Sequence, residues 1–232
     1  TFIGLKTNKF NTKIISQIKQ IEPDINLKLN DVSVVLDPLN FKLNLKTIGT
    51  DLIYKDKIIK IETIKSKIPI KSFLNEKFLL TDIFISTKSL AIKDLIQFVR
   101  LIRNDPKLFI AEKFIKKGYL VADLKLEFDD KGVIKKNYEL NGLVKDGKIN
   151  LFKKYNLDKI DFIFEIREKN LKFTDIDFII NKNKISVPNL VALKKDNEYL
   201  FSGKLNTNDT SLNKREINNF FGDDFLGLDI QD

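Results

Sequence analysis

The sequence has no cysteine, no histidine, no methionine and no tryptophan in 232 residues. Without cysteine there is neither a disulfide framework nor a thiolate nucleophile. Without histidine the chain lacks the commonest general base and the commonest ligand of transition metals. Ser-His-Asp triads, Cys-His dyads and ordinary zinc sites are therefore excluded. We expect no enzymatic activity, no metal and no other cofactor.

Long hydrophobic runs are absent as well. No apolar run approaches the ~18 residues with which a helix spans a bilayer. The chain is nevertheless 43% hydrophobic and 31% charged, which is the composition of a protein that folds. It begins at Thr1 and has no methionine, so we expect a piece of a longer or processed chain, with any membrane anchor upstream.

The formal net charge is +9, which would suit a nucleic acid or an anionic membrane. Arginine, the preferred residue for bidentate phosphate recognition, is rare beside lysine. Lysine, isoleucine, asparagine and phenylalanine are abundant, as an AT-rich genome would give. We interpret the charge as coding bias with a generic preference for anionic surfaces, and we expect no nucleic-acid partner.

Alternation of apolar and polar residues dominates the chain and is most regular from Gly118 to Leu205. Such alternation is typical of strands with one apolar face. Polar turns are expected at 129–132 and at Asp146-Gly147, because Asp-Gly between alternating residues is a strong hairpin signal. We predict a mainly β fold with a few short helices: an elongated antiparallel meander curled into an open groove (a β-taco), with a closed β-sandwich as the alternative.

Earlier segments also alternate. Strands are expected at 25–36 with a bulge at Asp31, at 41–47, in a hairpin of 51–54 with 57–64, and at 78–86. A single helical turn is expected at 70–74, after Pro69.

Apolar residues at helical spacing predict two longer helices, one from Thr7 or Asn8 to Ile21 and one from Ser89 to Ile102. The first either covers one end of the β core or lies on a membrane surface. A third helix is expected after Asp105-Pro106, ending near Gly118 unless a strand already begins at Phe114.

The expected organisation has three parts. Residues 1–117 form an N-terminal helix plus a β-meander with a helical insertion. Residues 118–205 form a C-terminal β-meander that continues the same sheet, and residues 206–232 form a polar linker.

The apolar faces of the strands are the candidate functional feature, because an uncovered apolar trough would have to bind something oily. Acyl chains suit a lining without buried charge. In a sandwich the same side chains would only fill a core, and periodicity does not decide between the two. The candidate lining residues are Phe41, Leu43, Leu45, Leu124, Leu126, Phe162, Phe164, Phe178, Ile180 and Phe201.

Four segments carry a resemblance to a known family: Leu5–Asn11, Ile61–Leu74, Gly118–Val121 and Gly142–Ile149. Their order and glycine placement resemble the AsmA-like proteins of Gram-negative envelopes, the group that includes TamB. The resemblance implies an inner-membrane anchor by an N-terminal helix, a periplasmic location and a body like the grooves of bridge-like lipid transfer proteins. It implies no catalysis and supplies no site residues.

The expected function is therefore a periplasmic lipid-binding or lipid-conducting β-groove that acts in phospholipid transport to the outer membrane and in outer-membrane biogenesis. Its expected partners are phospholipid acyl chains, with membrane contact through a segment outside this chain. The alternative is a scaffold or assembly module that binds an outer-membrane assembly protein at a strand edge.

Overall fold

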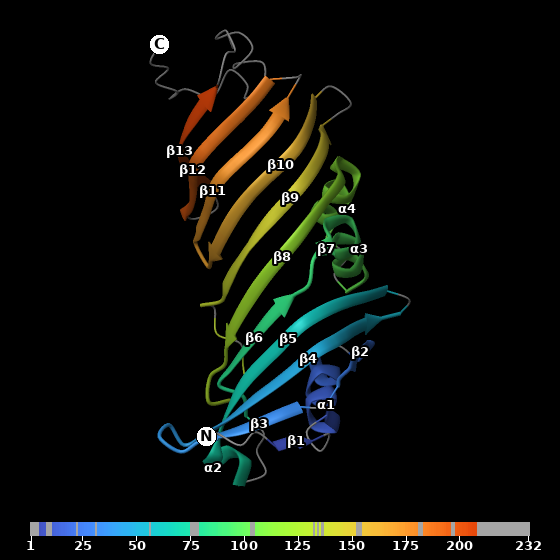
Figure 1. Ribbon diagram of the computed structural model, residues 1–232, viewed down its shortest axis with the longest axis vertical. Coiled ribbons are helices and arrows are strands. Elements are labelled where there is room, and N and C mark those ends of the chain that lie inside the picture. The colour runs from blue at the N-terminus through green and yellow to red at the C-terminus, as the bar shows by residue number, and fades with distance from the viewer. Residues whose placement is uncertain are drawn as a thin grey trace.

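A computed structural model describes residues 5–7, 11–21, 23–30, 32–55, 57–74, 79–102, 105–131, 133, 135, 137–151, 155–180, 183–195 and 198–207. In these residues the protein is a mainly β fold in which one long antiparallel sheet is curled and left open (Figure 1). The elements are β1 (Leu5–Thr7), α1 (Asn11–Ile21), β2 (Ile25–Lys28), β3 (Val32–Asp37), β4 (Lys42–Tyr54), β5 (Lys57–Pro69), α2 (Ile70–Leu74), β6 (Asp82–Thr87), β7 (Leu90–Ala91), α3 (Ile92–Ile102), α4 (Pro106–Phe114), β8 (Ile115–Glu127), β9 (Glu139–Leu151), β10 (Tyr155–Arg167), β11 (Asn170–Ile180), β12 (Asn183–Lys195) and β13 (Glu198–Thr207).

The sheet follows the chain almost in order: β1-β3-β4-β5-β6-β8-β9-β10-β11-β12-β13. The short strand β2 pairs with the far half of β4, beyond β3, and β7 pairs with β8. All described strands therefore belong to one sheet, and β1 and β13 lie at its two ends without pairing with each other. The open meander is the observed architecture, and the described strands do not divide into the two sheets of a sandwich.

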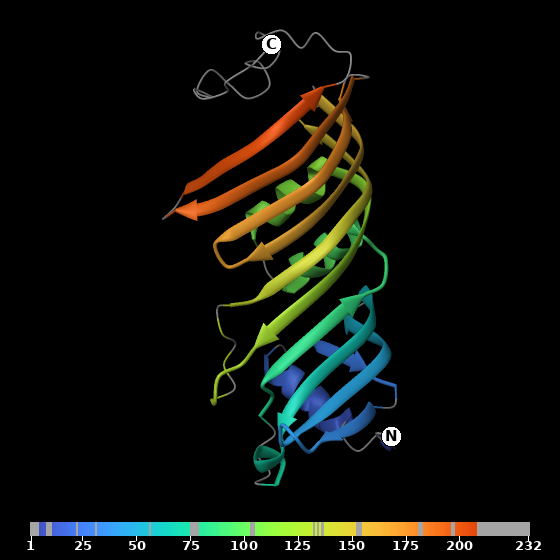
Figure 2. The same ribbon diagram turned by 60° about the vertical axis from the view of Figure 1, so that its left-hand side comes forward.

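Helices cover one face of the sheet at its N-terminal end and its middle, as Figures 1 and 2 show. Ile14 of α1 packs on the buried cluster of Val32, Leu45 and Ile68. Phe98 of α3 lies against Tyr54, with ring centroids 6.2 Å apart. We call the face that α1 and α3 cover the inner face, and the opposite one the outer face.

The described strands bend because most of the long ones carry an extra residue near their middle. Positive φ angles occur at Gly49 in β4, Gly118 in β8, Asp146 in β9, Lys159 in β10 and Asp175 in β11. Register shifts accompany them in the β8–β9, β9–β10 and β10–β11 pairs, and β12–β13 is shifted too. A bulge bends its strand and increases its twist, so a row of bulges across neighbouring strands curls the whole sheet.

Several sequence predictions are confirmed. The hairpin about 55–56, the helical turn Ile70–Leu74 and the interpretation of α1 as core cover all agree with the structure. At α4, Asp105 accepts a hydrogen bond from the Lys107 amide and Pro106 opens the helix. The strand that follows begins at Ile115, close to the earlier of the two predicted positions.

Other predictions are wrong. Asp146-Gly147 does not turn the chain, because β9 continues through it as a bulge. The predicted strand 78–86 begins only at Asp82, and the helix predicted from Ser89 begins at Ile92 because β7 first pairs with β8. The bulge expected at Asp31 and most of the linker 206–232 lie outside the described residues. The boundary expected at 117/118 falls within β8.

Candidate functional site

The inner face carries a continuous row of uncharged side chains across nine strands. Each member is the antiparallel partner of the next, so all of them point to the same face. From β4 to β13 the row is Thr47, Ile64, Ile85, Leu124, Leu140, Ile166, Leu171, Ala192 and Phe201. We call it the inner row. Hydrogen-bonded strands lie ~4.8 Å apart, so eight steps make an apolar track of roughly 38 Å across the sheet.

A second row of uncharged residues lies beside the inner row and contains both small and large side chains. The order is Ala122, Gly142, Phe164, Phe173, Leu190 and Gly203, so the small residues lie at its two ends and the large ones between them. A Cβ on Gly142 would come 2.6 Å from Cζ of Phe164, so this glycine makes room for the ring. The Phe162 ring lies 5.9 Å from the Phe173 ring in a T-shaped pair. The aromatic side chains thus pack along the sheet, and no helix separates them from one another.

The cover over the inner face ends part of the way along the sheet. The cluster of Ala122, Val144 and Phe164 is touched by one helical residue, Ile92 of α3. Helix α4 contacts α3, β8 and β9. Among the described elements, β10 to β13 have their substantial contacts only with β9 and with one another. In this part of the chain the inner face is therefore a trough whose lining consists of strand residues.

The structure places nine of the ten predicted lining residues on the inner face, in different surroundings. Leu45 is buried below α1 and Leu43 packs beside it, so these two belong to a helix-covered core. Leu124, Leu126, Phe162 and Phe164 lie in the middle of the sheet, and Phe178, Ile180 and Phe201 lie beyond the helix cover.

Phe41 is the exception among the predicted lining residues. It precedes β4 in a turn, has a positive φ of 50° and is 73% exposed. Its carbonyl accepts a hydrogen bond from the Ile70 amide, which ties the turn to α2. Phe41 is therefore a turn residue at the N-terminal end of the sheet and not a part of the trough.

Sequence reasoning did not select several residues that complete the rows: Leu140, Ile166, Leu171, Phe173, Leu190 and Ala192. The alternation of these residues with polar ones can be recognised in the sequence, but the residues with which they pair on neighbouring strands cannot. A further signal was present in the spacing. Inner-face residues follow each other at three positions instead of two at Val144/Gly147, Phe173/Ile176 and Val187/Leu190, which marks the bulges.

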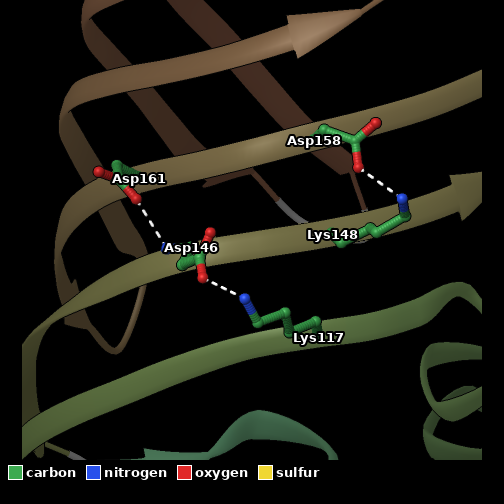
Figure 3. A network of polar contacts seen from close by, with 5 residues as sticks. All are labelled: Lys117, Asp146, Lys148, Asp158 and Asp161. Atoms are coloured by element: carbon green, nitrogen blue, oxygen red, sulfur yellow. Dashed lines mark hydrogen bonds and ion pairs between the residues drawn. The ribbon is translucent and has the colours of Figure 1, made fainter.

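The outer face carries a polar network along the row of bulges (Figure 3). Lys117 pairs with Asp146, and the Asp146 amide donates to Asp161 at 2.7 Å. Lys148 lies 2.8 Å from Asp158. The carboxylates thus take up backbone and lysine donors at the bulges of β9 and β10, where the regular ladder is interrupted.

These contacts shift two pKa values. The hydrogen bond from Lys117 to Asp146, with the attraction between their charges, raises the pKa of Lys117. Partial burial acts to raise the pKa of Asp161, but hydrogen bonds from Lys145 and from the Asp146 amide outweigh it and hold this pKa below its ordinary value. Both groups are therefore firmly charged at neutral pH, and they add charge to the outer face.

The described residues hold no group of three or more carboxylates that could bind a metal ion. None of their helices is long and apolar enough to cross a membrane. No protein-family model, no curated protein and no solved structure matches the chain. The two faces of the described sheet therefore differ in charge. The inner row is uncharged and partly uncovered, whereas the outer face carries ion pairs, with Val121, Leu143 and Ile163 exposed among them.

Proposed function

We propose that the inner face binds the acyl chains of phospholipids and that the trough over β10 to β13 is where they lie. The observation that carries the proposal is the inner row, which runs without a charged residue from β4 to Phe201 at the last strand. A core residue at the end of a closed fold would be buried. Phe201 is instead 59% exposed on the apolar face.

The energetics support an acyl chain as the ligand. About a dozen methylenes transferred onto an apolar lining contribute on the order of 10 kcal/mol, at ~0.8 kcal/mol each. That gain is comparable to what the same methylenes lose on leaving a bilayer, so a continuous lining is needed for transfer. The uncovered part of the inner row spans the three strand steps from β10 to β13, which is roughly 14 Å at ~4.8 Å per step.

The wider role is part of the same proposal. A body of this kind, in an AsmA-like protein anchored in the inner membrane and extended through the periplasm, would conduct phospholipids toward the outer membrane. The proposal contains no catalytic step and no cofactor. Its support is the uncharged inner row together with the polar, ion-paired outer face, which suits an aqueous surrounding.

Two neighbouring residues of β13 provide the test. Phe201 pairs with Ala192 on the inner face, whereas Leu200 pairs with Leu193 and points to the outer face. Leu200 is 64% exposed, so the two side chains are matched in exposure and in position along the strand. The variants Phe201→Asp and Leu200→Asp therefore add the same charge to opposite faces with similar cost to the fold.

The measurement is cross-linking of a phospholipid that carries a photoactivatable group in its acyl chain, with adducts mapped by mass spectrometry. We expect adducts on inner-face residues of β10 to β13. Phe201→Asp should lower the yield by about tenfold, because a carboxylate beside the chain must lose hydration, and Leu200→Asp should leave it unchanged. Equal yields in both variants, or adducts on the outer face, would refute the proposal.

A second candidate function is protein binding at the edge of β13, as in a scaffold or assembly module. Among the described strands, β13 pairs only with β12, and Tyr199, Leu200 and Phe201 are all exposed. Such an edge can accept a strand from a partner. A stable complex with an outer-membrane assembly protein that survives Phe201→Asp would favour this role over lipid binding.

A further inference from the structure

Helix α4 carries apolar side chains that the fold does not use. None of its residues is buried, whereas α3 buries Ile96 and Phe98 against the sheet. Phe109 is 45% exposed and Ile110 50% exposed. Leu101 near the end of α3, the helix that α4 contacts, is also exposed. Large apolar groups gathered on one short helix mark an interaction surface more often than isolated ones do.

Cations outnumber carboxylates around this patch. Lys107 and Lys113 lie on α4 and are exposed, as is Lys116 at the start of β8. The Lys113 ammonium lies 4.4 Å from the centre of the Phe109 ring, and the Arg100 guanidinium lies 5.1 Å from it. Aromatic rings flanked by cations are typical of the boundary between a membrane and water.

The carboxylates nearby are already engaged. Glu112 forms an ion pair with Arg100 and accepts a hydrogen bond of 2.9 Å from Gln97. Asp105 accepts from the Lys107 amide as the helix cap. The exposed face of α4 therefore presents Phe109 and Ile110 between lysines, with no free acid among its described residues.

A basic hollow adjoins the patch. It measures about 320 Å³ and is lined by Lys57, Gln97, Arg100 and Leu101. The Lys57 ammonium lies 3.4 Å from Oε1 of Gln97, so β5 adds a second cation to the hollow. A lipid phosphate group beside the inserted apolar side chains would meet these cations.

We propose that α4, with Leu101 and the basic hollow, docks on an anionic phospholipid bilayer. Phe109 and Ile110 enter the boundary region, and Lys107 and Lys113 meet the phosphates. Helix α4 contacts β8 and β9, where the helix cover of the inner face ends, so docking here brings the start of the trough to the membrane. The inference stands apart from the proposed acyl-chain binding, because adhesion to a vesicle requires no lipid to leave it.

The absence of tryptophan makes a direct test possible. In Phe109→Trp the new indole is the only one in the chain, and its emission reports the polarity around α4. We expect a blue shift on addition of vesicles of phosphatidylcholine with 30% phosphatidylglycerol, and little change with phosphatidylcholine alone. The matched reporter Leu39→Trp, at an exposed turn outside α4, should not shift.

Sedimentation with the same vesicles tests the residues themselves. Phe109→Ser/Ile110→Ser should lower partitioning by about tenfold, and Lys107→Gln/Lys113→Gln by about fivefold per charge. Leu39→Ser/Leu74→Ser removes two apolar side chains that are more exposed still, and it should bind like the parent protein.

The proposal is overturned if the α4 variants bind normally, if the Leu39/Leu74 variant loses binding, or if no vesicle is bound. A blue shift that follows protein concentration without vesicles would also overturn it, since the patch would then be a contact between copies of the chain.

Discussion

The two ends of the sheet bury their apolar residues in different ways. Under α1 and α3, the inner faces of β3 to β5 form cores in which Val32 and Ile68 lose nearly all contact with solvent. In β11 to β13 the same alternation has no substantial contact with a helix among the described residues, and Phe173 and Phe178 are only half-buried. The comparison shows that alternation specifies a one-sided strand, whereas the covering element decides whether that side becomes a core or a trough.

The bend of the sheet makes the second arrangement possible. In β10 to β12, neighbouring side chains on a curled surface shield one another, and Ile180, Ile185 and Ala192 are buried without a helix. A flat sheet would leave such residues exposed to water. Curvature of the sheet therefore buries some inner-face side chains that no helix covers. The remaining side chains of the inner face stay accessible to solvent.

The strongest test of the comparison substitutes one inner-face leucine in each region. Leu45→Ala below α1 should cost about 3 kcal/mol of unfolding free energy, because the helix and strands cannot collapse onto the cavity. Leu171→Ala in β11 should cost about 1 kcal/mol, because the half-buried side chain already faces solvent. Urea unfolding followed by circular dichroism measures both. Equal losses would mean that the two regions are packed alike.

A smaller effect is expected at the bulges that curl the trough. Lys159 has a φ of 51°, and a β-branched residue is strained there. Lys159→Val should therefore destabilise the protein by about 2 kcal/mol. Lys172→Val, on the outer face of β11, should change stability by no more than about 0.5 kcal/mol, because valine suits a regular strand. Thermal melts of both variants test this, and a neutral Lys159→Val would argue against a bulge at that position.

The smallest effect concerns the polar outer face beside these bulges. The pKa of Asp161 is lower in the folded protein than in the unfolded chain. Ionised Asp161 therefore stabilises the fold fully at pH values above the unfolded pKa, and this stabilisation is lost as the pH falls through the folded pKa. Asp161→Asn should cost about 0.5 kcal/mol at pH 7, since the ion pair with Lys145 is partly exposed. The difference from the parent should shrink below about pH 4. Urea unfolding at a series of pH values measures it, and a constant difference would exclude ionisation as the cause.

Much of the local structure could be predicted from the chain itself. The helical stripe at Ile92, Leu95, Ile96 and Val99 forms α3, and Asp105-Pro106 opens α4. Alternation correctly placed Leu124 and Leu126 on the face opposite Asp123 and Lys125. These features depend on neighbours in the sequence, so short-range patterns are sufficient to reveal them.

The Asp146-Gly147 pair shows where local patterns fail. The same dipeptide can close a hairpin or supply the positive φ of a bulge, since both need a residue that tolerates that conformation. The Lys117 side chain and the Asp161 carboxylate, which come from the strands on either side, hold Asp146 within β9. The choice between turn and bulge therefore belongs to contacts between strands.

By itself, the sequence determined the alternation of apolar and polar faces, the approximate positions of the helices with the Asp105 cap of α4, and the exclusion of histidine and cysteine chemistry. Tertiary structure alone decided that the strands join one open sheet, that Leu45 is covered while Phe201 is not, and that α4 leaves Phe109 and Ile110 to solvent. The physical reason is that burial depends on which surfaces meet. Helix cover, bulge position and strand pairing all join residues that are distant in the chain.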